Sequence, residues 1–379
     1  VLLVAGGVRR RGRRRYRDPP AHVRDAPPES RRRFDIAGAV LVAGGLGAAV
    51  FGTLRSAEWG WVAPNPGAPS LLGMSPTVWL ILAGLLVIWV FFERQFRLEA
   101  AGEEPLVKPS LFGNRHMTGG LLMFFLMFLV QAGLFFTIPL FLSVSLGLSA
   151  LDTGVRILPL SVTLLAAAVG IPRFRPNASP RRVVRLGLLA MFAGIAVLMS
   201  AIDPTADPQI VTVPLLLAGL GIGALASQLG AVTVSAVPDE LSPEVGGLQN
   251  TATNLGAAIG TALAGSILIT ALTSSFLQGV QANPAIPEQV KSQATVQLAS
   301  GVPFLSDVAL QDSLTRAGVN PVVSQAALDV NRQAQVDGLR SALAVLALIA
   351  LVGLFAARRV PDRPPRSATD AAPTGTDMR

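Results

Sequence analysis

The sequence contains no cysteine and only two histidines, His22 and His116, among its 379 residues. The lack of cysteine excludes disulfide bonds, thiol catalysis, iron–sulfur clusters and cysteine-ligated zinc. Two isolated histidines predict no metal site, and no cofactor is expected. A glycine-rich phosphate loop, a GxSxG turn and an HExxH helix are also missing, so the sequence predicts a protein that is not an enzyme.

Charge is scarce as well. Asp, Glu, Lys and Arg supply 14% of the residues, against about 25% in a typical soluble domain, while hydrophobic residues supply 51%. A transmembrane helix needs about 20 mostly apolar residues. We therefore predict an all-α polytopic membrane protein with about eight transmembrane helices, over residues 36–54, 71–92, 117–151, 152–172, 186–202, 209–238, 245–271 and 341–357.

The basic residues gather on one side of this predicted topology. With the N-terminus inside, 25 of the 31 Lys and Arg residues fall in cytoplasmic segments, as the positive-inside rule requires. This pattern predicts a multi-pass protein of the plasma membrane with both termini cytoplasmic. The arginine-rich stretch 9–33 has a single aromatic residue, so we expect it to contact anionic membrane lipid rather than nucleic acid.

One predicted helix carries two different faces. At about 100° per residue, Asn250 and Asn254 share one face, and Gly256 and Gly260 lie nearly opposite. The glycines form a GxxxG stripe that allows close helix packing. The asparagines could hydrogen-bond to a neighbouring helix or line a substrate cavity, and the sequence alone leaves both readings open.

Two other helices carry isolated polar residues beside small or aromatic ones. Gly219 and Gly223 form a second packing stripe, with Gln228 close by. Gln131 and Phe135 lie in a stretch rich in Phe and Met, which could line a pocket for hydrophobic or cationic small molecules. A lipid-facing surface would have much the same composition.

Charged residues are absent from the middle of every predicted span. Asp152 and Arg156, four residues apart at the outer end of one helix, could form an interfacial ion pair or part of an outer gate. Because no carboxylate lies mid-span, a proton-carrying group would have to come from elsewhere.

Ordered motifs along the chain resemble the major facilitator superfamily, in particular its fourteen-span drug:proton antiporters. The chain is similar to spans seven to fourteen of that branch. The matching segments are Phe34-Asp35-Ile36-Ala37-Gly38, Trp59-Gly60-Trp61, Glu93-Arg94 with Pro105-Leu106-Val107, Leu111-Phe112-Gly113-Asn114-Arg115, the stretch 146–159 with its Gly-x-Ser and Leu-Pro elements, Gly219-Leu220-Gly221-Ile222-Gly223, and 247–260.

The resemblance implies a domain plan. Residues 1–35 would be a basic cytoplasmic segment carrying the tail of a missing span, 36–93 two central transmembrane helices, and 94–116 a cytoplasmic loop. Residues 117–272 and 339–357 would form the C-terminal six-helix bundle. Between them, 273–338 would be an extracytoplasmic segment with two to four short helices, and 358–379 a disordered tail.

The resemblance also implies a function. It points to part of a multidrug efflux permease that exports amphipathic molecules by proton antiport, with an N-terminal half supplied elsewhere. The inner loop 172–182 departs from the family pattern, since Pro180 stands where glycine is expected, and this departure weakens the expectation of coupling by this chain alone. The alternative is a membrane scaffold or truncated remnant that does not transport and binds a partner through 273–338.

Overall fold

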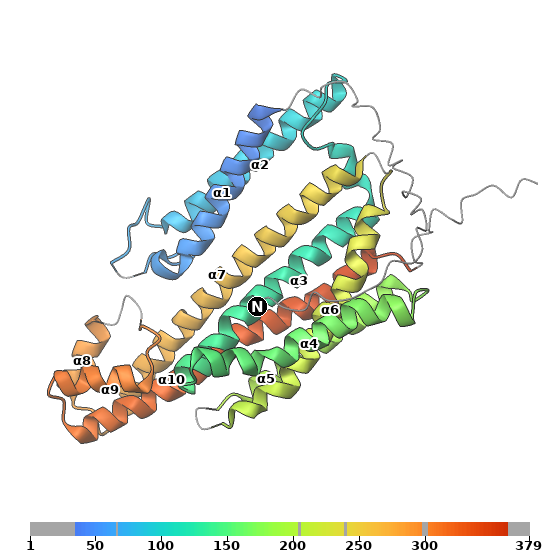
Figure 1. Ribbon diagram of the computed structural model, residues 1–379. Helices are drawn as coiled ribbons and strands as arrows, with labels where there is room; N and C mark the ends of the chain where they lie inside the picture. Colours follow the sequence, from blue (N-terminus) through green and yellow to red (C-terminus); the bar gives the residue numbers. More distant parts are fainter. Residues whose placement is uncertain (1–34, 66, 204–205, 239–240, 298–301, 363–379) are drawn as a thin grey trace, which may run out of the picture.

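The computed structural model describes residues 35–65, 67–203, 206–238, 241–297 and 302–362. These residues form helices, turns and loops, with one isolated β-bridge between Leu71 and Met74. Residues 1–34 of the predicted basic segment and 363–379 of the predicted disordered tail lie outside the described residues, whereas Ala357–Arg359, at the start of that tail, form a 3-10 helix. The helices (Figure 1) are α1 Ile36–Trp59, α2 Pro76–Ala100, α3 Arg115–Leu140, α4 Ala150–Phe174, α5 Pro180–Ala201, α6 Thr212–Val234, α7 Ser242–Ala282, α8 Glu288–Gln297, α9 Asp307–Arg316 and α10 Pro321–Ala356.

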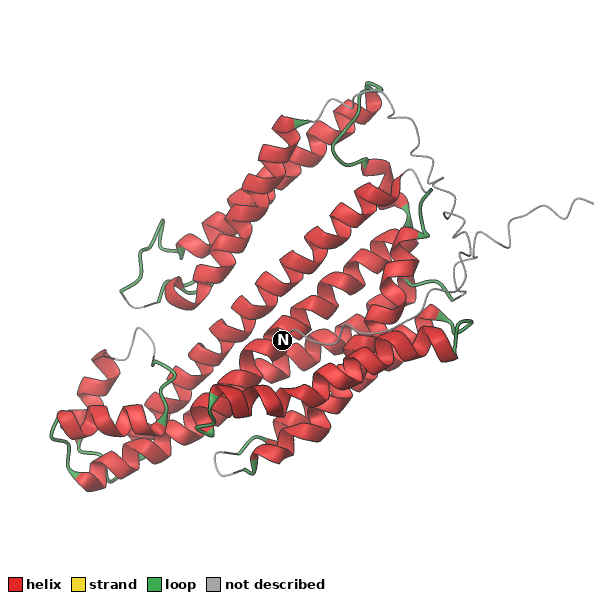
Figure 2. Ribbon diagram, viewed as in Figure 1, coloured by secondary structure: helices red, strands yellow, loops and turns green. Residues whose placement is uncertain are grey.

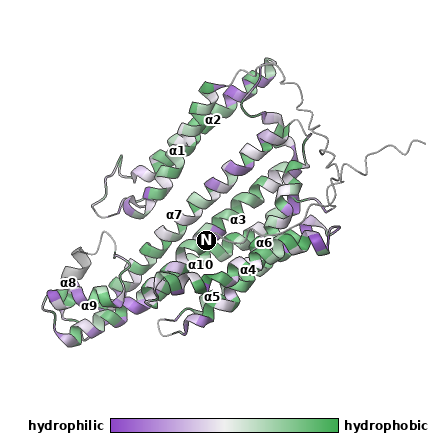
Figure 3. Ribbon diagram, viewed as in Figure 1, coloured by the Kyte–Doolittle hydropathy of each residue, from purple (hydrophilic) through white to green (hydrophobic). Residues whose placement is uncertain are grey.

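Eight of the helices in the described part of the chain are long and apolar enough to cross a membrane. All the secondary structure drawn is helical apart from loops and turns (Figure 2), so the all-α prediction is confirmed. Figure 3 shows apolar residues along the helix middles and hydrophilic residues gathered toward the helix ends. This is the distribution expected of helices whose central turns face hydrocarbon.

Local sequence sets the helix ends. Ser75, Asn114, Ser149 and Ser179 each accept a backbone hydrogen bond at the start of α2, α3, α4 and α5, which satisfies an otherwise unpaired N–H group. Near the C-terminal end of α3, Pro139 lacks the N–H group that a regular helix uses. The helix then passes into a π-helical turn, Phe141–Ser145.

Six helices form the main bundle around one apolar core. Its fully buried side chains come from all six helices, and include Met123, Leu160, Met191, Leu225, Leu268 and Leu343. Helices α1 and α2 form a hairpin beside α7 (Figure 1). The indole Nε1 of Trp61 donates to Ser266 Oγ at 2.8 Å and ties that hairpin to α7.

Two helices are much longer than their predicted spans. The α7 helix has 41 residues and α10 has 36. At 1.5 Å per residue, α7 is about 60 Å long, roughly twice the hydrocarbon thickness of a bilayer. Their adjoining ends pack together around a second core built on Leu272, Phe276 and Val280. Helix α8 contacts α7, and α9 contacts α10. We call this region, the described residues of 273–338, the outer cap, after the extracytoplasmic position that the sequence predicts for it.

Candidate functional site

The candidate residues Gln131 and Phe135 line one open pocket. Its volume is about 370 Å³, and α3 and α7 supply its walls. Phe135 is 41% exposed. Opposite these two residues, Ala257 and Thr261 of α7 complete the lining. The pocket is thus a mostly apolar depression with few polar groups, the usual make-up of a small-molecule site.

The Gln131 amide has its hydrogen-bonding capacity unused. In the described part of the chain its side chain makes no hydrogen bond, whereas the Thr261 hydroxyl donates to Ala257 O at 3.1 Å. A primary amide offers two donor hydrogens and an accepting oxygen. Leaving these unpaired in an apolar setting is costly, so Gln131 favours contact with water or with a polar group of a ligand.

Asn250 and Asn254 lie on the same face of α7 as the pocket wall. Both are exposed. The Asn254 Nδ2 group donates to Asn250 Oδ1 at 3.1 Å and to Asn250 O at 2.9 Å. Because residues at intervals of four and seven share a helix face, Asn250, Asn254 and Thr261 form one polar stripe. The side chain of Asn250 therefore bonds within α7 and to no other helix in the described structure.

Gln228 lies elsewhere. It is half-buried on α6, its Nε2 donates to Ser227 Oγ at 3.2 Å, and it does not line the pocket of Gln131. The structure therefore brings four of the five predicted cavity residues to one side of the α3–α7 pair and leaves Gln228 apart from them.

The glycine stripes lie where helix backbones meet. A Cβ atom added to Gly256 or Gly260 would lie 2.3 or 2.1 Å from a carbonyl oxygen of α3. On α6, a Cβ atom at Gly219 or Gly223 would lie 2.2 or 2.3 Å from a carbonyl oxygen of α4. Approaches this short leave no room for any side chain.

Asp152 and Arg156 do not form the ion pair that their spacing suggests. The Ser149 hydroxyl donates to Asp152 Oδ2 at 2.6 Å, and no ion pair joins Asp152 to Arg156 in the described structure. Asp152 is exposed at the first turn of α4 and Arg156 is half-buried one turn further. The Asp152 carboxylate thus lies in the first turn of α4, where the helix dipole favours negative charge.

A polar network where α1 begins and α2 ends was not among the predicted sites. Arg94 donates to Asp35 Oδ1 at 2.9 Å, and Gln95 Nε2 donates to Asp35 Oδ2 at 2.9 Å. Gln95 Oε1 in turn accepts from the N–H of Leu106 at 2.7 Å. The hydrogen bond from Arg94, with those from the Gly38 N–H and Gln95, lowers the pKa of Asp35 to about 2 against the opposing effect of its burial.

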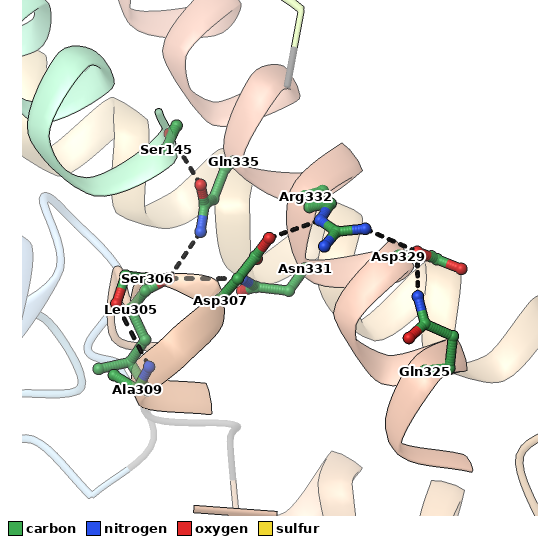
Figure 4. Close-up of polar contacts among 10 residues, drawn as sticks. All are labelled: Ser145, Leu305, Ser306, Asp307, Ala309, Gln325, Asp329, Asn331, Arg332 and Gln335. Carbon is green, nitrogen blue, oxygen red and sulfur yellow. Dashed lines mark hydrogen bonds and ion pairs between the residues drawn. The ribbon is translucent and has the colours of Figure 1, made fainter. Parts of the chain in front are cut away.

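A second network holds the outer cap to the bundle (Figure 4). Gln335 of α10 is 2% exposed. Its Oε1 accepts from the Ser145 hydroxyl at 2.7 Å, and its Nε2 donates to Leu305 O at 2.6 Å. One side chain therefore connects the end of α3, α10 and the loop before α9.

The same network continues toward the cap surface (Figure 4). Arg332 forms ion pairs with Asp307 of α9 and Asp329 of α10. Gln325 donates to Asp329 Oδ1 at 3.2 Å. These contacts fix α9 against the extended part of α10. Each network leaves a signal in the sequence. Polar residues recur at helical spacing along 325–335, and Asp35 and Arg94 belong to recognisable motifs. The residues that bind them lie far away in the chain, so the sequence does not identify these partners.

The model of the Major Facilitator Superfamily matches residues 21–261. The chain belongs to the major facilitator superfamily. This agrees with the eight long apolar helices of the described residues and makes the chain a multi-pass membrane protein of that superfamily.

Named relatives in the superfamily are resistance and export proteins. The tetracenomycin C resistance and export protein of Streptomyces glaucescens is 27% identical over 341 residues, covering 87% of this chain and 58% of that protein. The puromycin resistance protein of Streptomyces alboniger is 29% identical, covering 67% of this chain and 48% of the relative. The multidrug resistance protein Stp of Mycobacterium tuberculosis is 22% identical, covering 88% and 58%.

The chain thus spans about half the length of the curated relatives it matches. Among solved structures, a bacterial homologue of the human lysosomal transporter Spinster, in an inward-facing and occupied conformation, aligns with a TM-score of 0.43 and 18% identity, over 87% of this chain and 67% of the other.

Proposed function

We propose that this chain is the C-terminal part of a multidrug efflux permease that exports amphipathic small molecules, hydrophobic or cationic. The observation that carries the proposal is the pocket of Gln131 and Phe135. It combines an apolar aromatic wall with an unpaired amide, and it adjoins the exposed Asn250–Asn254 stripe. The resistance and export activities named for the relatives support the same class of substrate.

We further propose that the face carrying this pocket meets an N-terminal half supplied by another polypeptide or a longer product. Facilitator transporters hold substrate between two bundles that move against each other. An exposed polar stripe on α7 beside a shallow pocket is suited to such an interface. Proton antiport would then use carboxylates of the N-terminal half, since the middles of the spans described here carry none.

The proposed location is the plasma membrane, with both termini cytoplasmic. Segments 94–116, 173–185 and 357–362 support this orientation, since they are basic and meet at one end of the bundle. Arg181 donates to Val360 O at 2.7 Å, and His116 Nδ1 lies 3.3 Å from Arg359 O. The outer cap lies at the opposite end of the helices (Figure 1).

The test is dye efflux in an exporter-deficient bacterium that expresses this chain with an upstream six-span half. We expect wild type to lower accumulation of a lipophilic cationic dye and a protonophore to abolish that effect. Gln131→Leu should reduce efflux about tenfold, because a hydrogen bond to substrate is worth about 1–1.5 kcal/mol. Gln278→Leu, an exposed glutamine outside the pocket, is the matched control.

Equal efflux by Gln131→Leu and wild type at equal membrane abundance would remove the pocket from the proposal. No efflux with any N-terminal half, despite normal insertion, would favour the scaffold or remnant alternative. Capture of a specific partner, lost when the outer cap is deleted, would then identify the scaffold function.

A further inference from the structure

The inner halves of α4 and α5 border an open groove whose floor is α6. The groove has a volume of about 1050 Å³. Gly170 and Phe174 line it from α4, Leu186 and Ala190 from α5, and Leu220 and Ala224 from α6. Although the turn at 175–179 joins α4 directly to α5, the two helices each pack along α6 and scarcely touch one another.

Glycines on α6 explain why the groove exists. A Cβ atom at Gly219 or Gly223 would meet carbonyl oxygens of α4 at 2.2 and 2.3 Å, whereas a Cβ atom at Gly221 would meet Gly187 O of α5 at 2.5 Å. Gly219 and Gly223 are four residues apart and share one side of α6, whereas Gly221, two residues from each, points to the other side. Helices α4 and α5 therefore pack closely against different sides of α6, and the space between α4 and α5 stays open.

The mouth of the groove is positively charged. Arg175 and Arg182 line it, both are exposed, and neither has an ion-pair partner in the described structure. Arg181 lies between them in sequence but turns away to pair with Asp362. The start of α5, capped by Ser179, adds the positive end of a helix dipole at the same place.

We propose that this groove binds an anionic phospholipid from the leaflet beside the 175–179 turn. The phosphate would lie against Arg175 and Arg182, and an acyl chain would lie between α4 and α5. Basic pockets between transmembrane helices bind anionic lipid head groups. The apolar side chains at the rim agree with a lipid occupant, since Phe174 is 81% and Leu186 67% exposed. The inference stands apart from the efflux proposal, because it concerns a different face of the bundle.

Native mass spectrometry of the purified full chain tests the site, with the phosphatidylglycerol, phosphatidylcholine and inorganic phosphate adducts each titrated. We expect phosphatidylglycerol to be retained at least tenfold more strongly than phosphatidylcholine, and inorganic phosphate not to be retained. Arg175→Gln with Arg182→Gln should weaken phosphatidylglycerol retention roughly tenfold or more. Arg97→Gln, an exposed arginine at the same end of the helices, is the matched control.

A second variant probes the acyl-chain part with both arginines intact. A Cβ atom at Gly170 would meet only Phe174, at 3.8 Å and beyond, so Gly170→Leu should fill the groove without disturbing the bundle. It should lower phosphatidylglycerol retention, whereas Gly154→Leu, at an open position on α4 outside the groove, should not.

Three outcomes would overturn the proposal. Equal retention of phosphatidylglycerol and phosphatidylcholine would indicate ordinary surrounding lipid. Retention that survives the double arginine substitution would place the lipid elsewhere. Retention of inorganic phosphate as strong as that of phosphatidylglycerol would indicate a free-phosphate site at the turn.

Discussion

Single residues decide how closely the helices of this bundle approach. Gly260 faces Leu129 O of α3 at a distance that admits no Cβ atom, while Gly230 on α6 has open space around it. Both are glycines in apolar helices, so their sequence contexts look alike. The GxxxG spacing marked Gly256 and Gly260 as packing residues, but only the tertiary structure identifies α3 as their partner.

Gly260→Leu should therefore destabilise the bundle. Forcing a side chain into a filled interface typically costs about 1–3 kcal/mol, and more where backbone atoms block it. We expect lower membrane abundance and an unfolding temperature in detergent that falls by several degrees. Gly230→Leu should leave both near wild type, and a similar loss in the two variants would contradict the packing argument.

Asp35 is a second residue whose role depends on distant partners. Its side chain is 5% exposed, caps α1 through the Gly38 N–H at 2.9 Å and binds Arg94. A Cβ atom at Gly38 would lie 2.2 Å from the Asp35 carboxylate, which explains the fixed spacing of aspartate and glycine in this motif. The motif could be recognised in sequence, whereas its link to Gln95 and the 101–109 loop could not.

Asp35→Asn should destabilise the hairpin at neutral pH by about 1–3 kcal/mol, because Arg94 loses a charged acceptor. The folded pKa of about 2 lies below the unfolded value near 3.9. The carboxylate's contribution is thus complete above about pH 4 and is lost as pH falls toward 2. Denaturation of both proteins in detergent should show a stability difference that is constant from pH 8 to 5 and shrinks below 4. A difference that already changes between pH 8 and 5 would contradict the assignment.

At the scale of elements, α7 and α10 depart most from the sequence prediction. Their apolar stretches set the predicted spans at 245–271 and 341–357, yet α7 runs on to Ala282 and α10 begins at Pro321. Hydropathy detects long apolar stretches, and it does not detect a helix that continues as a more polar segment packed against another helix. The second core of Leu272, Phe276 and Ala334 stabilises these continuations.

Gln335→Leu tests how the outer cap is held. Losing its bonds to Ser145 and Leu305 O should raise amide hydrogen exchange in 302–316 several-fold, while exchange in α5 and α6 stays unchanged. Gln325→Leu is the control, since Gln325 bonds only to exposed Asp329. Unchanged exchange in the Gln335 variant would show that apolar packing alone holds α9.

For the whole molecule, the absence of cysteine makes the proposed orientation directly testable. Single cysteines at the exposed positions Gly113 and Asn177 should be shielded from a membrane-impermeant maleimide in intact cells. Cysteines at Ser70 and Gln311, also exposed, should react. Labelling of Asn177→Cys together with Gln311→Cys from outside would overturn the even arrangement of spans.

The sequence by itself determined the number of spans, the all-helical class and the clustering of positive charge, because each depends on local composition over about 20 residues. It also supplied the superfamily motifs. The tertiary structure decided which helix faces meet. Glycine contacts seat α7 on α3 and separate α4 from α5 on α6, and these long-range pairings place Gln131 beside Thr261 and open the groove at Arg175. Such pairings follow from backbone approach between distant segments, which no local pattern specifies.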